Sequence, residues 1–180
     1  VRRAGHERSA AALEGICLGL LVSLASLEIR VLIAGGITYE NPQFLEMAAH
    51  ILTWGGAAWG LMHRQRLFSS FVSTWGARVL LLMAGAATVV LSLGALNPVF
   101  TGDPVPGGLV FNALLLAYLL PVPLILLIAR RLDVIGWQAA QPAAHALALI
   151  LLFAYVTIQT KRVFQGMMLV PESLSLAETY

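Results

Sequence analysis

Ionisable side chains are rare inside the apolar stretches of this sequence, and those that occur there are its candidates for chemistry. Glu28 and Arg30 lie within one such stretch, and Glu46 and His50 lie early in the next. A charge exposed to lipid near mid-bilayer costs about 3 kcal/mol, so these groups face inward or find a partner. Glu28 and Arg30 are two residues apart and point to different faces of a helix. We expect Arg30 to meet Glu46 as an ion pair, with snorkelling to the headgroups as the alternative.

Glu46 and His50 are four residues apart and share one helix face. Such a pair is suited to a proton relay or to half of a metal site, but a metal would need further ligands from elsewhere. The simpler interpretation is an interfacial histidine hydrogen-bonded to a neighbouring helix. Because the sequence holds no nucleophile elbow, no HExxH motif and no dinucleotide fingerprint, we assign it no catalytic residue, metal ligand or cofactor. Whether it is an enzyme stays open, with the negative answer favoured.

A second set of candidates lies on one later apolar segment and comprises Asn112, Tyr118, Pro121 and Pro123. Each proline removes an intrahelical hydrogen bond and leaves a carbonyl one turn earlier without its usual donor. Broken helices with freed carbonyls line substrate paths in some transporters, whereas many other prolines only kink a membrane helix. We expect a bend near Pro121 and a polar face that points into the protein.

A sequence pattern that occurs twice in the chain gives a third set of candidate residues. Arg30 and Lys161 are each followed five residues later by glycine, and further along by Glu46 and Glu178, with nearly equal offsets. We therefore expect Lys161 or Arg162 to meet Glu178 as Arg30 meets Glu46. Four apolar segments fall between the two copies, which predicts a parallel repeat whose units begin near residue 10 and again near residue 142. Chance similarity between apolar sequences is the alternative.

Composition decides which solvent surrounds these residues. Of the 180 residues, 59% are hydrophobic and 11% are charged, and the mean hydropathy is +0.83. A soluble domain carries about a quarter charged residues, so this chain has too little polar surface for water. Its basic residues sit in small groups between apolar blocks and not in one stripe, which argues against nucleic acid as a partner. We expect membrane lipids and other membrane protein subunits as partners.

The apolar residues fall into five blocks, each near the length of about 20 residues that a helix needs to cross the hydrocarbon core. These blocks are continuous and do not alternate with polar residues, so helices are favoured over a β-barrel. The sequence predicts a single all-α transmembrane domain over residues 1–180, with about five helices. We place them at residues 10–34, 44–62, 79–96, 109–129 and 143–160.

Orientation follows from the basic residues, which in short loops favour the cytoplasmic side. They gather before the first block, in the second connection and in the fourth, as Arg2, Arg3 and Arg8, then Arg64, Arg66 and Arg78, then Arg130 and Arg131. This pattern predicts a multi-pass protein of the bacterial inner membrane with a cytoplasmic N-terminus. Arg30, Lys161 and Arg162 fall on the opposite side and depart from the rule.

Several stretches resemble a large bacterial family of polytopic membrane proteins known as domain of unknown function 2339. Residues 108–121 (GLVFNALLLAYLLP) and 129–132 (ARRL) resemble a recurring helix of that family. Residues 161–166 (KRVFQG) and 177–180 (AETY) resemble its basic-Phe-His-Gly and Ala-Glu-Leu-Tyr elements, with Gln165 in place of the histidine. The resemblance covers most of residues 20 to 180. It implies a membrane protein with many helices, and it implies no activity. Because the sequence starts at Val1 and its last residues look like the entry to another helix, we expect a fragment of a larger, parallel-repeat helical bundle.

Three functions from different classes remain. The first is a transporter or flippase-like protein, which a water-filled cavity reaching mid-membrane would favour. The second is a non-catalytic membrane subunit or scaffold, which apolar faces and small-residue contacts would favour. The third is a membrane-embedded enzyme of envelope lipid or glycan metabolism, with Glu28, Glu46 or His50 as acid or base. This third hypothesis is the weakest, because no nucleophile or complete metal set accompanies those residues.

Overall fold

A computed structural model of the protein describes residues 2–35, 43–102, 105, 107–108 and 111–165, and this part of the chain is helical without any strand. The all-α prediction is confirmed for it. In chain order the elements are α1 (Arg2–Ala34), α2 (Phe44–Leu67), α3 (Phe71–Ala86), the π-helix η1 (Ala87–Ala95), α4 (Pro98–Thr101), the π-helix η2 (Leu115–Leu119), α5 (Pro121–Ala129), the 3-10 helices η3 (Leu132–Ile135) and η4 (Gln138–Ala140), and α6 (Gln141–Gln165).

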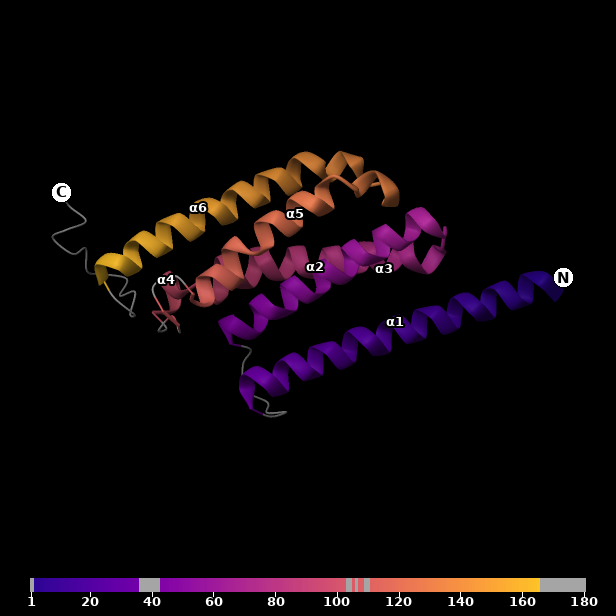
Figure 1. Ribbon diagram of the computed structural model, residues 1–180, viewed down its shortest axis with the longest axis horizontal. Helices are drawn as coiled ribbons and strands as arrows, with labels where there is room; N and C mark the ends of the chain where they lie inside the picture. Colours follow the sequence, from indigo (N-terminus) through magenta and orange to yellow (C-terminus); the bar gives the residue numbers. More distant parts are fainter. Residues whose placement is uncertain (1, 36–42, 103–104, 106, 109–110, 166–180) are drawn as a thin grey trace.

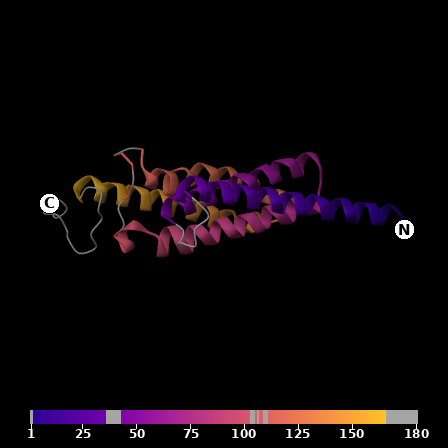
Figure 2. The same ribbon diagram turned by 90° about the horizontal axis from the view of Figure 1, so that it is seen from below.

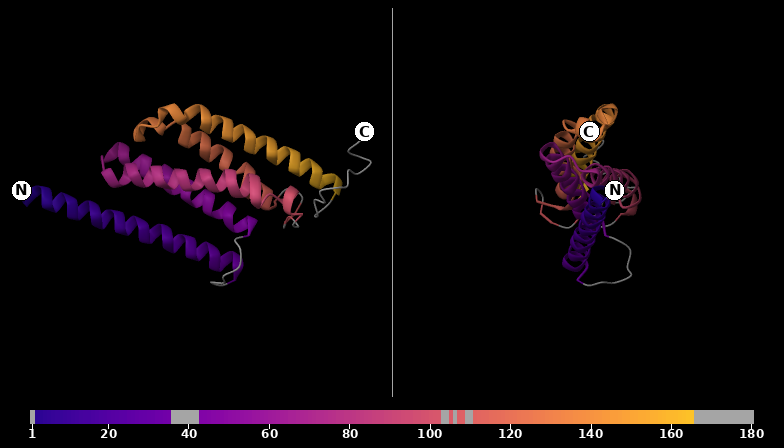
Figure 3. Two further views of the ribbon diagram at one scale, coloured as in Figure 1. Left: turned by 180° about the vertical axis from the view of Figure 1, so that it is seen from behind. Right: turned by 90° about the vertical axis from the view of Figure 1, so that its right-hand side faces the viewer.

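The long helices lie side by side and alternate in direction along the chain (Figure 1). Helices α1, α3 and α6 run one way, and α2 and α5 run the other way. The pair α5 and α6 forms one side of the elongated bundle, α2 and α3 form its middle, and α1 forms the other side, as views from below and behind also show (Figures 2 and 3). The closest pairs are α2 with α3 and α5 with α6, whereas α1 contacts mainly α2 and α3.

The bundle therefore has two ends of different composition. One end, which we call the basic end, holds the turn between α2 and α3 and the connection over residues 130–140, with Arg64, Arg66, Arg78, Arg130 and Arg131. The other end, which we call the loop end, holds the last turns of α1 and α6, the first turn of α2 and the described residues 97–102, 105, 107–108 and 111–114. The described polar candidates of the sequence lie at or towards the loop end.

Three stretches of helix are long and apolar enough to cross a membrane, namely Ser9–Ala34, Phe71–Thr101 and Gln138–Phe164. Each of the other two apolar blocks also contains a helix. Leu115–Ala129 is a shorter apolar helix, and the 24-residue α2 carries charged residues at both ends. Many of the large apolar side chains on α1, α3 and α6 are exposed on the outside of the bundle, as lipid-facing residues are.

The third helix begins at Phe71, eight residues before the predicted start at Val79. Ser70 caps it, because its hydroxyl accepts a hydrogen bond at 3.4 Å from the backbone N–H of Ser73. Ser73 accepts a hydrogen bond from Arg64 of α2, and the Thr74 hydroxyl donates to the carbonyl of Ser70, so a helix that looks too polar on hydropathy alone is stable here. For a similar reason α2 continues to Leu67 and α6 to Gln165, beyond the predicted apolar blocks.

Small residues bring the central helices close together. Ala48, Ala58, Ala77, Ala117 and Ala148 are all buried between helices. Close backbone approach through small residues is the usual way in which helices associate in membranes, since lipid gives no hydrophobic drive. Three buried clusters result. One lies around Leu114, Tyr118 and Leu151 towards the loop end, and one around Met62, Ile128 and Ile135 towards the basic end. The third comprises Met47, Ile51 and Ala87.

Two π-helical segments interrupt the regular helices and face one another. In η2 the backbone N–H of Leu120 donates to the carbonyl of Leu115 at 2.9 Å, five residues back, and Pro121 follows directly. In η1 the N–H of Leu96 donates in the same way to Leu91 at 2.8 Å. The α-helical ladder is thus broken at the proline, as the sequence predicts, although the interruption takes the form of a wide turn.

Candidate functional site

Arg30 and Glu46 form the predicted ion pair. The Nη1 of Arg30 donates to Oε1 of Glu46 at 3.0 Å and joins the last turns of α1 to the first turn of α2. Glu46 is almost fully buried, and the same oxygen lies 3.6 Å from Nε2 of His50 one turn on. The His50 ring stacks on Trp54, with centroids 5.2 Å apart. The arrangement is a buried carboxylate held between a cation and an imidazole.

Replacing Glu46 by glutamine is expected to lower the free energy of unfolding by about 1 kcal/mol, because the amide keeps the shape but loses the charge that Arg30 faces. Glu28 is the matched control, since it lies on α1 beside Arg30 but is exposed. Glu28→Gln should leave the free energy within about 0.5 kcal/mol of the wild type. Unfolding in mixed detergent micelles measures both values. Equal losses for the two variants would show that the ion pair does not hold α1.

Arg162 lies at the loop end and is buried, with 4% of its surface exposed. Its guanidinium donates to three backbone carbonyls, those of Val105 at 3.2 Å, Gly107 at 2.7 Å and Gly108 at 2.8 Å. The planar fork of arginine suits several acceptors at once. The predicted contact of Lys161 or Arg162 with Glu178 lies outside the described residues. Within them, the buried cation of α6 binds the backbone that precedes η2.

The polar residues of the predicted helix-four path point into the protein and are bound there. Tyr118 is fully buried, and its hydroxyl donates to the carbonyl of Ser92 in η1 at 2.6 Å. Asn112 caps the helix by accepting from the N–H of Leu115 at 3.1 Å, and its amide donates to Gln159 of α6 at 3.1 Å. These contacts join η2 to its neighbours on both sides.

Other predicted residues do not join these groups. Pro121 is buried at the start of α5, but Pro123 is exposed on the outer side, so it does not line a path inside the bundle. Glu28 is exposed. It is two residues from Arg30 and so points to a different face of α1 from the side chain that pairs with Glu46. Lys161 is half-buried and lies one position from Arg162.

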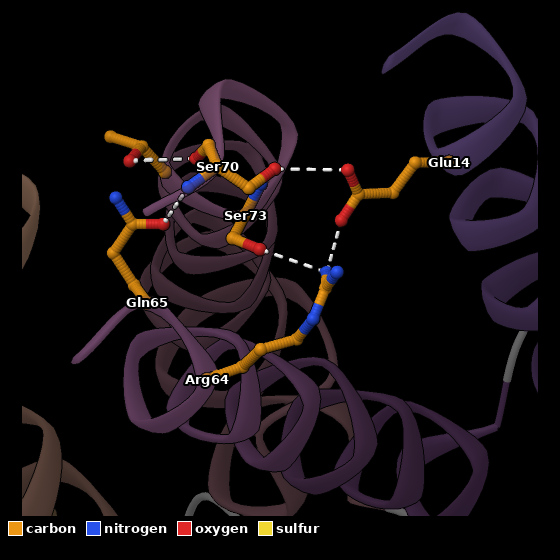
Figure 4. Close-up of polar contacts among 6 residues, drawn as sticks. Glu14, Arg64, Gln65, Ser70 and Ser73 are labelled. Carbon is orange, nitrogen blue, oxygen red and sulfur yellow. Dashed lines mark hydrogen bonds and ion pairs between the residues drawn. The ribbon is translucent and has the colours of Figure 1, made fainter. Parts of the chain in front are cut away.

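A polar cluster at the basic end joins α1 to α2 and α3, and sequence reasoning missed it. Glu14 of α1 pairs with Arg64 of α2 and accepts a hydrogen bond from the Ser70 hydroxyl at 2.9 Å. Arg64 also donates to the hydroxyl of Ser73 at 3.0 Å, and Gln65 accepts from the N–H of Ser70 at 2.8 Å (Figure 4). A lone glutamate inside an apolar block is itself a signal that it has an inward partner.

Helix α1 is attached along one narrow stripe. Glu14, Leu18, Ser26 and Arg30 recur at multiples of four residues and so lie near one face. Leu18 abuts Gly76 of α3, where an added Cβ would lie 2.6 Å from its Cδ2. Ser26 lies along the helix between Glu14 and Arg30, and its hydroxyl accepts a hydrogen bond at 3.4 Å from the indole N–H of Trp54 on α2. Polar contacts therefore hold α1 near both ends of its membrane-spanning part.

Two arginines of the basic end, Arg78 and Arg131, rest on tryptophan rings. The guanidinium of Arg78 lies 4.9 Å from the ring centroid of Trp75 and 5.7 Å from that of Trp137. That of Arg131 lies 5.2 Å from the ring of Trp59. Cation–π contacts of this kind fix the direction of a charged side chain at little cost in desolvation.

Two cavities in the described part of the chain have almost wholly apolar walls. One, of about 340 Å³, lies among α2, α3, α5 and α6 and includes Gly55 and Gly85. The other, of about 470 Å³, lies between α1 and α3. Within the same part of the chain, no three side chains of histidine, cysteine, aspartate or glutamate gather around a point that could hold a metal ion.

Comparison with protein families gives one result. The family model for a predicted membrane protein, DUF2339, matches residues 1–178, which is nearly the whole chain. Neither the curated proteins nor the solved structures contain a match. The match agrees with the resemblance noted in residues 108–132 and 161–180.

Proposed function

The chain belongs to the DUF2339 family of predicted membrane proteins, and from that premise we propose that it is a multi-pass protein of the bacterial inner membrane that acts as a non-catalytic subunit or scaffold. Its role is to pack against other membrane proteins. Support comes first from the direction of the helices, then from the partners of the buried polar groups, and finally from the exposed face of α1.

Five crossings follow from the order of the helices. Helices α1, α3 and α6 have the required length and hydropathy, and they run in the same direction (Figure 1). If all three cross the membrane, the chain must return twice between them, through α2 and through the segment 111–129. The arginines of the basic end then mark the cytoplasmic side, together with the N-terminus. Since α1 and α6 are also parallel, the arrangement meets one requirement of a parallel repeat with units near residues 10 and 142.

The observation that carries the scaffold function is that the buried polar side chains bind helix to helix. Arg30 binds Glu46, Arg162 binds the carbonyls of the loop, and Tyr118 binds the carbonyl of Ser92. The cavity among α2, α3, α5 and α6 and the cavity between α1 and α3 are apolar. A path for an ionic substrate needs polar groups that face a water-filled space. Arg30, Glu46, Arg162 and Tyr118 have structural partners, which favours a packing role over transport and over acid–base catalysis by Glu46.

Helix α1 offers a surface for such packing. Its attachment uses one narrow stripe, and the rest of its circumference carries large exposed apolar side chains, among them Leu20, Leu24 and Val31. A single helix that leaves most of its surface outside the bundle is well suited to be covered by helices of another protein. Lipid covers whatever part of this surface remains free.

A transport or flippase-like function is the second candidate, and the paired π-helices favour it. Wide π-turns occur frequently at functional sites, and here two of them meet through Tyr118 and Ser92. The Ser92 hydroxyl is also buried and has no hydrogen-bond partner in the described part of the chain. If the hydrogen bond between Tyr118 and Ser92 opened, the hydroxyl and the carbonyl of Ser92 would become accessible to a substrate that passes between η1 and η2.

Photo-crosslinking in cells separates the two functions. A benzoylphenylalanine at Leu24, which is 55% exposed, is expected to give one adduct of defined mass with another membrane protein. The same residue at Leu114, which is fully buried, is the control and should give no intermolecular adduct. In parallel, the purified protein in vesicles should leave lipid scrambling and proton leakage at the level of protein-free vesicles. Accelerated scrambling or leakage, with only lipid adducts at Leu24, would contradict the scaffold proposal and support transport.

A further inference from the structure

The groove between α1 and α3 has two glycines in its α1 wall. Gly15 and Gly19 line it, and a Cβ added to Gly19 would meet nothing within 4 Å. The α3 wall runs from Phe71 to Met83, and the twelve steps between these residues span about 18 Å of helix. One leaflet of the hydrocarbon core is about 15 Å thick. The groove thus has the length and the lining of a site for one extended acyl chain.

A polar pocket adjoins this groove at the basic end. It has a volume of about 380 Å³ and is lined by Gln65, Ser69, Thr74 and Arg78, together with Phe71 and Trp75. The two aromatic residues belong to the walls of both spaces, so the polar pocket and the apolar groove meet at their rings. An apolar channel that opens into a pocket of hydroxyl, amide and guanidinium groups matches the two halves of a phospholipid.

Arg78 gives the pocket its charge. Its Nε and Nη2 donate to the carbonyl of Ile135 at 3.1 and 2.6 Å, and the rings of Trp75 and Trp137 fix its plane. Within the described part of the chain, no carboxylate lies within ion-pair distance of this guanidinium. Because a guanidinium has five N–H donors, some remain for another acceptor. A phosphate oxygen is the acceptor that such a positively charged fork favours.

We propose that this place is a specific site for an anionic glycerophospholipid, with one acyl chain in the groove between α1 and α3 and its phosphate beside Arg78. The charge of the basic end supports an anionic lipid over a neutral one, since five arginines lie there with Glu14 and Asp133 as the described carboxylates nearby. Basic pockets between membrane helices on the cytoplasmic side are a recognised way to bind anionic headgroups.

The polar cluster around Glu14 keeps the groove in place. Because Glu14 binds Arg64 and Ser70, α1 is held to α2 and α3 beside the mouth of the groove (Figure 4). The same contacts neutralise Arg64, so that Arg78 and not Arg64 is the cation available to the headgroup. The acyl chain of the lipid would occupy the groove and so pack between α1 and α3.

Lipid binding to the delipidated full chain in an uncharged detergent tests this site, with native mass spectrometry as the readout. Dioleoyl phosphatidylglycerol should bind about fivefold more tightly than dioleoyl phosphatidylcholine, the preference expected from one arginine. Arg78→Gln should remove the preference, and Arg78→Lys, which keeps the charge, should retain it. Inorganic phosphate alone should not compete, because the acyl chain supplies much of the binding.

Gly19→Leu should weaken the binding of both lipids, because its side chain fills the groove without touching Arg78. Gly85→Leu is the matched control, since Gly85 also has open space around its Cβ but lines the other apolar cavity. It should leave binding unchanged. Equal affinity of the wild type for the two lipids, or unchanged binding to Gly19→Leu, would overturn the proposal, and so would competition by inorganic phosphate. These outcomes do not depend on whether the protein acts as a scaffold.

Discussion

Replacing Arg162 by methionine is expected to lower the free energy of unfolding by about 3 kcal/mol. This loss is larger than the one expected for Glu46→Gln. Methionine keeps much of the apolar stem but removes the guanidinium that donates to the carbonyls of Val105, Gly107 and Gly108. The carbonyl of Val105, a buried residue, pays a desolvation penalty when it loses its donor, whereas Gly107 and Gly108 are exposed and water can replace the guanidinium at their carbonyls. Thermal or denaturant unfolding in mixed micelles measures the change.

Lys161 provides the control for this prediction, because it is adjacent in sequence and also basic but is only half-buried. Lys161→Met should change the free energy by no more than about 0.5 kcal/mol. Arg162→Lys should fall between the two, since a point charge cannot serve three separated acceptors as the planar fork does. If both methionine variants lost the same stability, general hydrophobic effects and not the carbonyl contacts would explain the result.

The second large effect is expected at Gly107, in the loop that Arg162 holds. Its φ angle is +106°, a region that residues with a side chain rarely adopt. An added Cβ would lie 2.6 Å from the carbonyl oxygen of Phe111 and 2.7 Å from the Cα of Asn112, both backbone atoms. Gly107→Ala therefore combines backbone strain with a clash that only a movement of the loop can relieve. We expect a loss of about 3 kcal/mol in unfolding free energy.

Gly108→Ala is the matched control, because its Cβ would lie 3.8 Å from the same Phe111 oxygen, an ordinary contact, and its φ is not positive. That variant should remain within about 1 kcal/mol of the wild type. The double variant Gly107→Ala, Arg162→Met should lose less than the sum of the single losses, since both changes release the same loop. Strict additivity would show that Arg162 and Gly107 act on different structures.

The parts of this molecule that could be predicted from sequence are those that depend on short distances along the chain. Each predicted apolar block contains a helix, because hydrophobic runs and proline–glycine connections are local signals. The Arg30–Glu46 pair was also predictable, since the two residues flank one short connection and each is costly to leave without a partner in lipid. The inward orientation of Tyr118 followed from the same solvation argument.

Contacts that depend on how distant helices align could not be predicted. Glu14 and Arg64 are 50 residues apart, and they meet only because of the register in which α1 crosses α2. The described acceptors of Arg162 are backbone carbonyls. Every residue carries such a carbonyl, so no residue type in the sequence indicates this contact. The position of Pro123 on the outer face likewise depends on the wide turn of η2, a conformation that the proline pattern alone does not specify.

The start of the third helix was predicted too late in the sequence, because its polar residues find partners inside the protein. Hydropathy placed it at Val79, because Ser73, Thr74 and Arg78 look too polar for a membrane helix. In the structure Ser73 binds Arg64, and Arg78 binds a carbonyl and two aromatic rings, so each polar group has a partner that replaces water. A hydropathy average depends only on the residue types in one stretch of sequence, so it does not include the hydrogen-bond partners that these side chains find in other segments.

Cysteine labelling from the two sides of the membrane tests most directly whether these helices form a five-span bundle with the basic end in the cytoplasm. Ser69 and Thr101 are exposed and lie at opposite ends of the bundle, and Cys17→Ser removes the natural thiol. In intact cells, a membrane-impermeant maleimide should label a cysteine at position 101 and leave one at position 69 unlabelled until the membrane is opened. Labelling of both positions from the same side would contradict the bundle topology and, with it, the proposed orientation.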